Sequence, residues 1–356
     1  MRIAVTGASG LVGGQVVAAA AASGHQVRAV VRRRVDVPGA GPGAVIGEDF
    51  ETVRASLADP DSLRAAFAGC DAVVHCAAVY AFGAERAAEV ERVNTTGTVA
   101  VVQAAADAGA GRVVVTSSSV TRGSAATAVA RTELDVLGDE PAPAYYASKV
   151  EQERLALQAG EHGGVAVLLA LPTVVLGGPA ARLVPSNAIV LRYLLDLTRS
   201  TYPGGCNVVD ARDVGHGHVL LLERGEAGQR YLLGGQNLSW RALHATVAEL
   251  AGLPGPFLEV PRPLAQAMVK VADGWGRLTS SAPLVTADEA DTVGRWYWYD
   301  HARASALGYS PRSGRDALAS SLAWLLVGDK VPRWVREGLS PSAEVRAARP
   351  LVPRSL

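Results

Sequence analysis

Short apolar runs alternate with helical stretches through the first half of the chain. Apolar runs bounded by turn residues predict buried strands at 3–5, 26–31, 71–75, 112–116 and 165–171. Helices are predicted between them at 16–22, 60–67, 85–108 and 145–159, the second with Asp59 as its N-cap and Pro60 in its first turn. Strands that alternate with helices predict an α/β fold built on a doubly wound parallel sheet, a Rossmann fold.

The alternation of strands and helices stops after Gly178. Helices are predicted at 181–198, 239–251 (capped by Ser239), 264–278, 300–307 and 315–326, with a proline-broken linker at 254–263. Two short apolar runs, 206–209 and 230–233, are expected to return to the sheet as strands. This half of the chain therefore predicts a smaller, mostly helical lobe, set over the carboxyl edge of the sheet where ligands bind in such folds.

Composition narrows the class of protein. The 356 residues are 49% hydrophobic, which predicts an ordered globular chain, and 34 basic side chains balance 34 acidic ones, which argues against nucleic acid or an acidic membrane as a partner. Three cysteines without metal-ligand spacing favour reduced thiols in the cytoplasm and no metal site. No apolar run is long enough to span a membrane, and glycines interrupt the N-terminal apolar stretch that a signal peptide would need.

Gly7, Gly10 and Gly13 follow the first predicted strand and precede the first predicted helix. A strand, a tight glycine turn and a helix N-terminus form a binding site for a pyrophosphate, because glycines permit close backbone approach and the helix supplies free N–H groups. We therefore predict a dinucleotide-binding domain at residues 1–178, completed by the returning strands within 206–234. The cofactor contacts expected at this turn are Thr6, Gly7, Ser9, Gly10, Leu11, Val12 and Gly13.

Residues 179–205 and 235–340 are expected to form the substrate-binding lobe. Residues 341–356 are expected to be a tail, because Leu351–Ser355 resembles the recognition site of a protease used to remove expression tags.

The sequence Tyr145-Tyr-Ala-Ser-Lys149 carries the strongest chemical signal. On a helix, residues four apart share a face, so Tyr145 and Lys149 should point the same way. A phenol has a pKa of about 10, and a nearby ammonium lowers that value by stabilising the phenolate. The pair predicts a proton donor and acceptor for a substrate oxygen, while Tyr146 is expected to pack or to face the substrate.

The strand at 112–116 runs into a series of hydroxyl side chains, Thr116-Ser-Ser-Ser119. Such a run often does no more than end a strand, but here it delivers hydroxyl groups to the carboxyl edge of the sheet. A serine at that edge can hydrogen-bond a substrate oxygen and hold it against Tyr145.

Taken together, these motifs resemble the extended branch of the short-chain dehydrogenase/reductase superfamily from Met1 to Leu326, above all its dihydroflavonol reductase-like members. In that family the catalytic serine lies five residues before a glycine, which implies Ser118, with Ser119 as the alternative. The segment Val93–Thr98 resembles the family's Asn-containing helix, so Asn94 is implied to support the active-site lysine. The resemblance leaves a homodimer open.

Further segments resemble the family's cofactor-lining positions. His75-Cys-Ala-Ala78 resembles its strand-end motif, in which His75 is expected to be a packed core residue, and Leu171–Pro179 resembles the segment beside the nicotinamide, with Leu171 where the family usually has an arginine. Ser56-Leu57 lies where the family often has Asp-Leu beside the adenine. The cofactor contacts that these segments imply are Ala77, Ala78, Val79, Pro172, Thr173, Val175, Ser56 and Leu57.

The residues after the second strand favour one cofactor over the other. NAD(H) binding usually places an acidic residue there for the ribose 2′-hydroxyl, whereas this chain has Arg32, followed by Arg33 and Arg34. A guanidinium complements a 2′-phosphate, so NADP(H) is favoured over NAD(H), although these arginines would also suit a solvated turn.

The predicted activity is that of an NADPH-dependent carbonyl reductase or dehydrogenase acting on a small, partly apolar ketone or alcohol. A nucleotide-sugar epimerase, which uses the same tyrosine and lysine but recycles its hydride, is the alternative, and Arg182, Arg192 and Arg199 are candidates for holding its diphosphate. A 4,6-dehydratase is disfavoured because a serine rather than an acid follows Ser118. A cofactor-sensing regulator is disfavoured because Tyr145 and Lys149 are intact.

Overall fold

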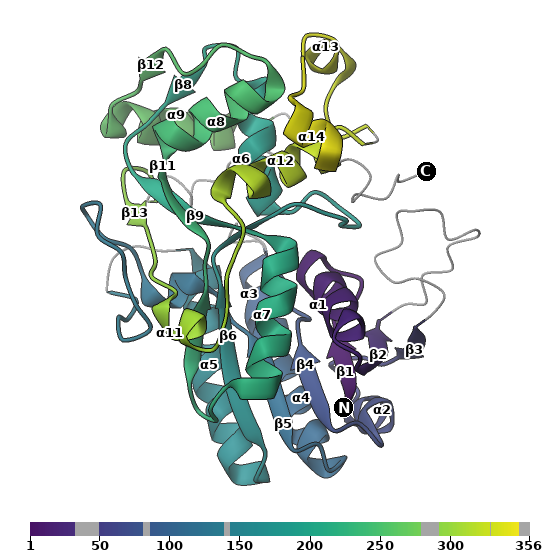
Figure 1. Ribbon diagram of the computed structural model, residues 1–356. Coiled ribbons are helices and arrows are strands. Elements are labelled where there is room, and N and C mark those ends of the chain that lie inside the picture. The colour runs from purple at the N-terminus through teal and green to yellow at the C-terminus, as the bar shows by residue number, and fades with distance from the viewer. Residues whose placement is uncertain (33–49, 81–85, 139–142, 279–291, 328, 349–356) are drawn as a thin grey trace.

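A seven-stranded parallel sheet forms the centre of the larger lobe (Figure 1). The computed structural model describes residues 1–32, 50–80, 86–138, 143–278, 292–327 and 329–348. Across the sheet the order is β10 (Arg230–Leu233), β6 (Ala166–Pro172), β5 (Arg112–Thr116), β4 (Ala72–His75), β1 (Arg2–Thr6), β2 (Gln26–Val31) and β3 (Glu51–Arg54).

The strand order confirms the predicted doubly wound fold. The chain winds outward from β1 to β3, then crosses back to β4 and winds outward on the other side, every neighbouring pair being parallel. The order reverses between β1 and β4, and ligands bind outside the carboxyl ends of the strands at such a reversal.

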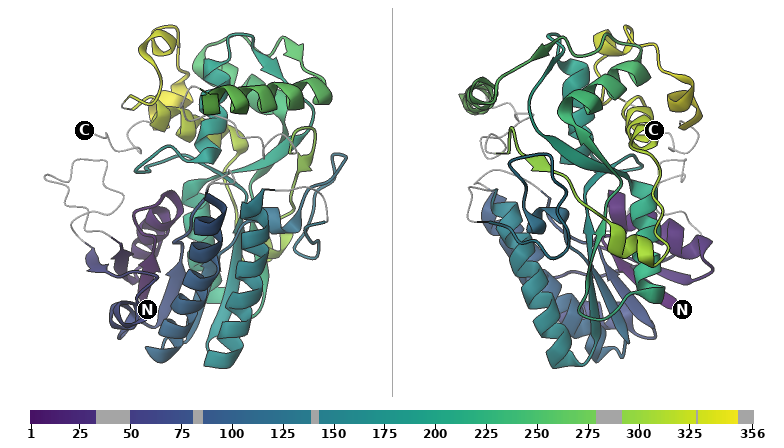
Figure 2. Two further views of the ribbon diagram at one scale, coloured as in Figure 1. Left: turned by 180° about the vertical axis from the view of Figure 1, so that it is seen from behind. Right: turned by 60° about the vertical axis from the view of Figure 1, so that its left-hand side comes forward.

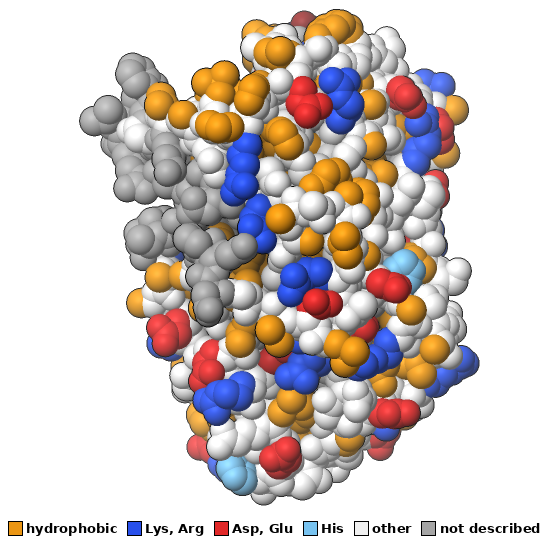
Figure 3. All heavy atoms as spheres, turned by 90° about the vertical axis from the view of Figure 1, so that its left-hand side faces the viewer, with side chains coloured by type: hydrophobic (Ala, Val, Ile, Leu, Met, Phe, Trp, Pro, Cys, Tyr) orange, Lys and Arg blue, Asp and Glu red, His pale blue; other side chains and the backbone are white. Residues whose placement is uncertain are grey.

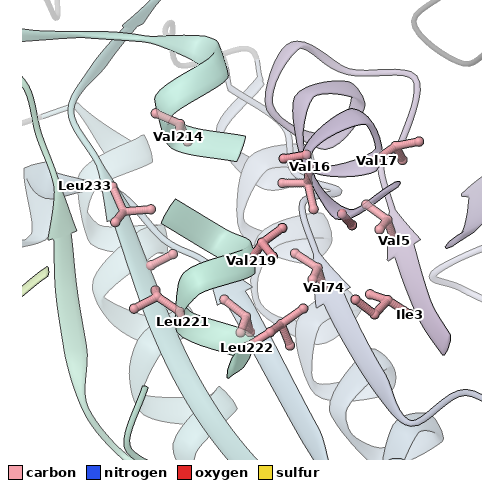
Figure 4. Packing of buried hydrophobic residues seen from close by; sticks show 14 of the residues in the cluster. Ile3, Val5, Val16, Val17, Val74, Val214, Val219, Leu221, Leu222 and Leu233 are labelled. Carbon is pink, nitrogen blue, oxygen red and sulfur yellow. The ribbon is translucent and has the colours of Figure 1, made fainter. Parts of the chain in front are cut away.

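Helices cover both faces of this sheet (Figure 1 and Figure 2). Because side chains alternate along a strand, Ile3 and Val5 of β1 point into one apolar cluster and Ala4 into another. Helices α1 (Leu11–Ala22) and α7 (Ala211–Arg224) contribute to the first cluster, shown in Figure 4. The second cluster is covered by α2 (Pro60–Phe67), α4 (Thr96–Asp107) and α5 (Ala144–Gly163).

The smaller lobe has a sheet of its own. Strand β9 (Gly205–Asp210) pairs with β7 (Val174–Leu176) and β13 (Trp296–Tyr297) in parallel and with β11 (Gln236–Ser239) in antiparallel fashion. The expectation that residues 206–209 return to the main sheet is therefore wrong, whereas β10 does join it, beside β6. Strand β7 starts this second sheet because the chain leaves β6 at Pro172.

The helices of the smaller lobe pack around this second sheet and leave apolar side chains at the surface. They are α6 (Pro185–Leu195), α8 (Trp240–Ala251), α9 (Arg262–Leu278), α12 (Gly314–Leu325), α13 (Arg333–Arg336) and α14 (Ala343–Ala348), and β8 (Ser200–Thr201) pairs with β12 (Leu258–Glu259). Helix α11 (Ala302–Ala306) packs against β10 of the larger lobe instead, and its Ala304 belongs to the same apolar cluster as Ile3. Figure 3 shows hydrophobic side chains exposed among basic ones on the upper part of one face.

Three predicted segments differ clearly from the structure. The single helix expected at 85–108 is two helices, α3 (Ala87–Asn94) and α4, which meet at Thr95. The helix expected at 181–198 is shorter, since α6 ends at Leu195. Val345 of α14 is fully buried in the core of the smaller lobe, so residues up to Ala348 belong to that lobe rather than to a tail.

Candidate active site

Tyr145 and Lys149 lie on the same face of α5, near its N-terminal end. The helix begins at Ala144, directly after Pro143, which places both residues in the first turns beside the carboxyl edge of the sheet. Both side chains are buried, and the Lys149 Nζ lies 5.8 Å from the centre of the Tyr145 ring. The structure thus brings together the two residues that the i, i+4 spacing predicts to be neighbours.

Ser118 and Ser119 have different partners. Ser118 is extended and precedes the short 3-10 helix η2 (Ser119–Arg122), and its hydroxyl hydrogen-bonds the Tyr145 side chain. The Ser119 side chain is buried and hydrogen-bonds Tyr299 instead. Of the two serines left open by the sequence, the structure brings Ser118 to Tyr145.

Burial dominates the acidity of Tyr145. It raises the pKa of this phenol above its usual value of 10, and the hydrogen bond from Ser118 opposes the rise. The phenol is therefore protonated at neutral pH and ready to donate. To accept a proton in the reverse direction it needs further positive charge nearby, which Lys149 and an oxidised nicotinamide would supply.

Lys149 is held by two oxygen acceptors inside the protein. Its Nζ donates to the carbonyl oxygen of Thr116 at 2.9 Å and to Oε1 of Gln152 at 2.8 Å. Burial lowers the pKa of Lys149 to about 7, although Glu153 and Cys76 act in the opposite direction. Sequence reasoning missed Gln152, because a glutamine carries no motif of its own.

Asn94 ties the end of β4 to α5. Its Oδ1 accepts from the backbone N–H of Val79 at 2.9 Å, and its Nδ2 donates to the Val79 carbonyl and to Ser148 Oγ. These bonds fix the backbone beside the expected nicotinamide position and the turn of helix that carries Lys149. The partners of its side chain among the described residues are Val79 and Ser148, so any support that this side chain gives Lys149 is indirect.

The glycine turn is shaped for a pyrophosphate. Gly7 has a φ of +67°, and a Cβ there would lie 2.6 Å from the backbone nitrogen of Ala77; a Cβ on Gly13 would lie 2.2 Å from the Gly7 oxygen. Helix α1 begins after Gly10 with no side-chain cap and no acidic residue in its first turn. Its free N–H groups and positive dipole end suit an anion, so these residues fit a dinucleotide cofactor.

Thr6 and His75 face each other across β1 and β4 within the core. The Thr6 hydroxyl lies 2.7 Å from His75 Nδ1, and His75 Nε2 lies 3.0 Å from Thr98 Oγ1. Burial lowers the pKa of His75 to about 3, with Lys149 adding to the effect, so the imidazole is neutral. His75 is a packed core residue, as expected, and the Thr6 hydroxyl is directed at it rather than toward a cofactor.

The other expected cofactor residues border the same edge to differing degrees. Ala78 is exposed, and Leu57 packs against Gly97 of α4. The Thr173 hydroxyl donates a hydrogen bond to Asn207 Oδ1 at 2.8 Å. Partly exposed residues are Ser9, Val12, Ser56 and Ala77, and buried ones are Leu11, Val79, Pro172 and Val175.

Arg32 is exposed at the end of β2. The hydrogen bond from Arg86 is the main cause that lowers the pKa of Glu89. The charge of Arg32 adds a smaller contribution in the same direction, so the Arg32 guanidinium lies near α3. Arg33 and Arg34 lie outside the described residues.

An aromatic cluster surrounds Tyr145. The Tyr80 ring lies 4.9 Å from the Tyr145 ring, and Tyr146 meets Tyr145 and Tyr297 edge-on. Aliphatic side chains complete the cluster: Val79, Val90, Val93, Val120 and Leu137. The sequence did not identify Tyr80 or Tyr297, since Tyr297 comes from β13, far along the chain.

The arginines considered for a sugar diphosphate are not arranged as expected. Arg192 lies on α6 but Arg199 lies beyond its end, so the two do not share a helix face. Arg199 donates to the Tyr193 carbonyl at 2.9 Å, and its guanidinium lies over the Tyr193 ring. Leu171 is fully buried in the core, so its presence in place of an arginine gives no direct information about the substrate.

Among the described residues no group of side chains could hold a metal ion, and none of their helices combines the length and apolarity needed to cross a bilayer.

Known proteins resemble this chain in sequence and in fold. Residues 3–234 match the model of the NAD dependent epimerase/dehydratase family. The chain is 31% identical to a putative dihydroflavonol 4-reductase from Synechocystis over 90% of this chain and 93% of that protein. It is 32% identical to cinnamoyl-CoA reductase 1 of Oryza sativa over 70% of this chain and 75% of that protein.

A solved nucleoside-diphosphate-sugar epimerase from Pseudomonas aeruginosa shares the fold. Its TM-score is 0.71 at 24% identity, covering 93% of this chain and 99% of that one. Given the family match, the two reductase-named relatives and this fold, the chain belongs to the NAD dependent epimerase/dehydratase family, the extended short-chain dehydrogenase/reductases, and is an NAD(P)-dependent oxidoreductase of its dihydroflavonol reductase-like branch.

Proposed function

We propose that this protein is an NADPH-dependent carbonyl reductase that acts on a small, partly apolar ketone or aldehyde. The cofactor, when bound, supplies the hydride. Tyr145 donates the proton that the carbonyl oxygen needs as it becomes an alcohol, and Ser118 hydrogen-bonds the same oxygen and holds it against the phenol. Lys149 then stabilises the phenolate that is left.

The observation that carries this proposal is the aromatic cluster against the reactive phenol. Tyr80 packs directly on Tyr145, and Tyr146, Tyr297 and neighbouring aliphatic residues continue the apolar surface. Such a surface favours a carbonyl compound with an apolar substituent. The two relatives that are named as reductases also support the reduction of a carbonyl group.

The preference for NADPH is supported by the exposed Arg32 at the end of β2. A guanidinium at this position can form charge-assisted hydrogen bonds with a 2′-phosphate, whereas the usual NAD-binding residue is acidic.

A nucleotide-sugar epimerase is the second candidate, favoured by the shared fold and by the suitability of the same tyrosine and lysine for reversible hydride transfer. Against it, Arg199 is engaged by Tyr193, which removes one candidate for binding a diphosphate.

The deciding experiment separates net consumption of cofactor from its recycling. The purified protein is incubated with stoichiometric NADPH and a panel of ketones and aldehydes, and in parallel with trace NADP⁺ or NAD⁺ and nucleotide sugars. Loss of NADPH absorbance together with an equal amount of alcohol supports the reductase. Interconversion of a nucleotide sugar without net change in cofactor would replace the proposal with the epimerase.

A further inference from the structure

A buried chain of hydrogen bonds leads from the glycine turn to Lys149. Gln152, fully buried one turn after Lys149 on α5, accepts from Lys149 Nζ at 2.8 Å and donates through Nε2 to Thr98 Oγ1, also at 2.8 Å. Thr98 donates its own proton to the Asn94 carbonyl at 2.7 Å. The contacts between Thr98 and His75 and between His75 and Thr6 extend the chain to the end of β1.

The direction of each bond in this chain follows from the donors available. An ammonium can only donate, so the Gln152 oxygen must face Lys149 and its amide nitrogen must face Thr98. Since the Thr98 proton goes to Asn94, Thr98 Oγ1 accepts from both Gln152 and His75. His75 therefore carries its proton on Nε2, and its Nδ1 accepts from Thr6. Each of these side chains thus has a hydrogen-bond partner on both sides, and a Gln152 flip would break two bonds.

Two of the three N–H groups of Lys149 are thereby fixed, one by the Thr116 carbonyl and one by Gln152. With the Thr116 carbonyl alone, the ammonium could swing about a single acceptor. The second acceptor lies on the helix that also carries Tyr145, so it sets the position of the charge relative to the phenol.

The charges around Lys149 show why it matters that its acceptor, the Gln152 side chain, is neutral. Titratable or charged groups face Lys149 or its partners from three elements. Tyr145 and Glu153 lie on α5, and His75 and Cys76 lie at the end of β4. His218 of α7 contacts Thr116. Burial keeps both histidines neutral. Glu153 is already paired with Arg122 and Arg230. Burial lowers the pKa of the Lys149 ammonium to about 7, and the charge of Glu153 offsets this effect only in part.

We propose that Gln152 is a positioning residue for Lys149, a neutral amide clamp that joins the Lys149 ammonium to Thr98 and holds it on the Tyr145 side of α5. Its importance for turnover rests on the proposed function, because it acts through the lysine of that site. A carboxylate in its place would neutralise the ammonium, and an apolar side chain would release it.

The first test measures Lys149 directly and requires neither substrate nor cofactor. The chain has three lysines, so protein labelled with ¹³C-lysine gives three side-chain signals, and the one lost in Lys149→Met identifies Lys149. We expect Gln152→Glu to raise the pKa of this signal by at least one unit and Gln152→Leu to lower it. Gln158→Glu is the matched control, because Gln158 is exposed on the same helix and contacts Arg154.

An unchanged Lys149 titration in Gln152→Glu, or an equal shift in Gln158→Glu, would overturn the proposal. This outcome would stand whether or not the protein reduces carbonyl compounds, so it is distinguishable from failure of the proposed function.

The second test concerns turnover, and its Thr98 variants cover the case in which Gln152 variants do not fold. Gln152→Leu should lower kcat about ten- to a hundred-fold with little change in KM, the range expected for loss of one hydrogen bond to a charged group. Thr98→Val, which removes the hydroxyl that orients Gln152, should shift the Lys149 titration and lower kcat, and Thr98→Ser should restore both. Equal behaviour of the valine and serine variants would contradict the clamp.

Discussion

Glu153 is a buried charge in the middle of α5, and its replacement by glutamine gives a sharp prediction for stability. Its side chain is 2% exposed; Oε2 accepts from Arg122 at 3.1 Å and from Arg230 at 2.8 Å, and Oε1 accepts from Ser117 at 2.7 Å. The substitution Glu153→Gln would keep the size of the side chain, but it would remove the charge and put an amide donor where an oxygen now faces donors.

The magnitude follows from the exposure of the two arginines. A hydrogen bond to a charged group contributes about 1.5–3 kcal/mol. We count Arg122 in full because its side chain is 8% exposed, and Arg230 at about half because 31% of it reaches water, which screens the loss. The expected decrease in the free energy of unfolding is about 2–4.5 kcal/mol, which overlaps the range of about 3–5 kcal/mol for breaking a buried ion pair.

The assay is urea unfolding followed by tryptophan fluorescence, with Glu151→Gln as the matched control. Glu151 lies on the same helix and pairs with Arg154, but both side chains are well exposed, so its replacement should cost at most about 1 kcal/mol. A difference between the two variants of less than about 1 kcal/mol, at equal m-values, would refute the reasoning.

Four further predictions concern the site. Tyr145→Phe should lower kcat about 10²–10⁴-fold without loss of NADPH binding by calorimetry, because only the proton donor is removed; near-normal turnover would exclude the assigned role. Arg32→Asp should weaken NADPH binding about ten- to a hundred-fold and favour NADH, as calorimetry with both cofactors would show. Gly13→Ala should destabilise the fold by about 1–3 kcal/mol and impair cofactor binding, because its Cβ would lie 2.2 Å from the Gly7 oxygen; unchanged urea unfolding would contradict this. The native state releases the Lys149 proton near pH 7, whereas the unfolded chain keeps it to about pH 10.4, so this residue makes stability rise with pH across that interval. Lys149→Met should remove the rise in urea experiments between about pH 6.5 and 9.

Residues whose signals are local could be predicted from the sequence. Asp59 and Ser239 cap their helices as expected, and the spacing of Tyr145 and Lys149 placed them on one face of α5. Each of these features depends on neighbours within a few positions, so it survives the packing of the rest of the chain.

Features that depend on distant packing could not be predicted. Helix α7 contains Gly215 and Gly217, which weaken a helical pattern, yet a Cβ at Gly215 would lie 2.5 Å from the Gln15 oxygen of α1. The break between α3 and α4 falls at Thr95, whereas the nearest glycine, Gly97, lies within α4. The residues that hold Lys149 and line Tyr145, such as Gln152 and Tyr297, acquire their roles only where the fold places them.

The position of β10 has a consequence for anyone who wishes to recombine this enzyme with a relative. The last strand of the main sheet is reached only after residues 179–205 have passed through the other lobe, and the chain then enters that lobe a second time. A gene cut once near Gly178 would leave β6 as an unpaired edge and Glu153 without Arg230. We therefore expect that moving the smaller lobe into a relative requires the exchange of two separate segments in the same chimera, while the host keeps its own α7 and β10.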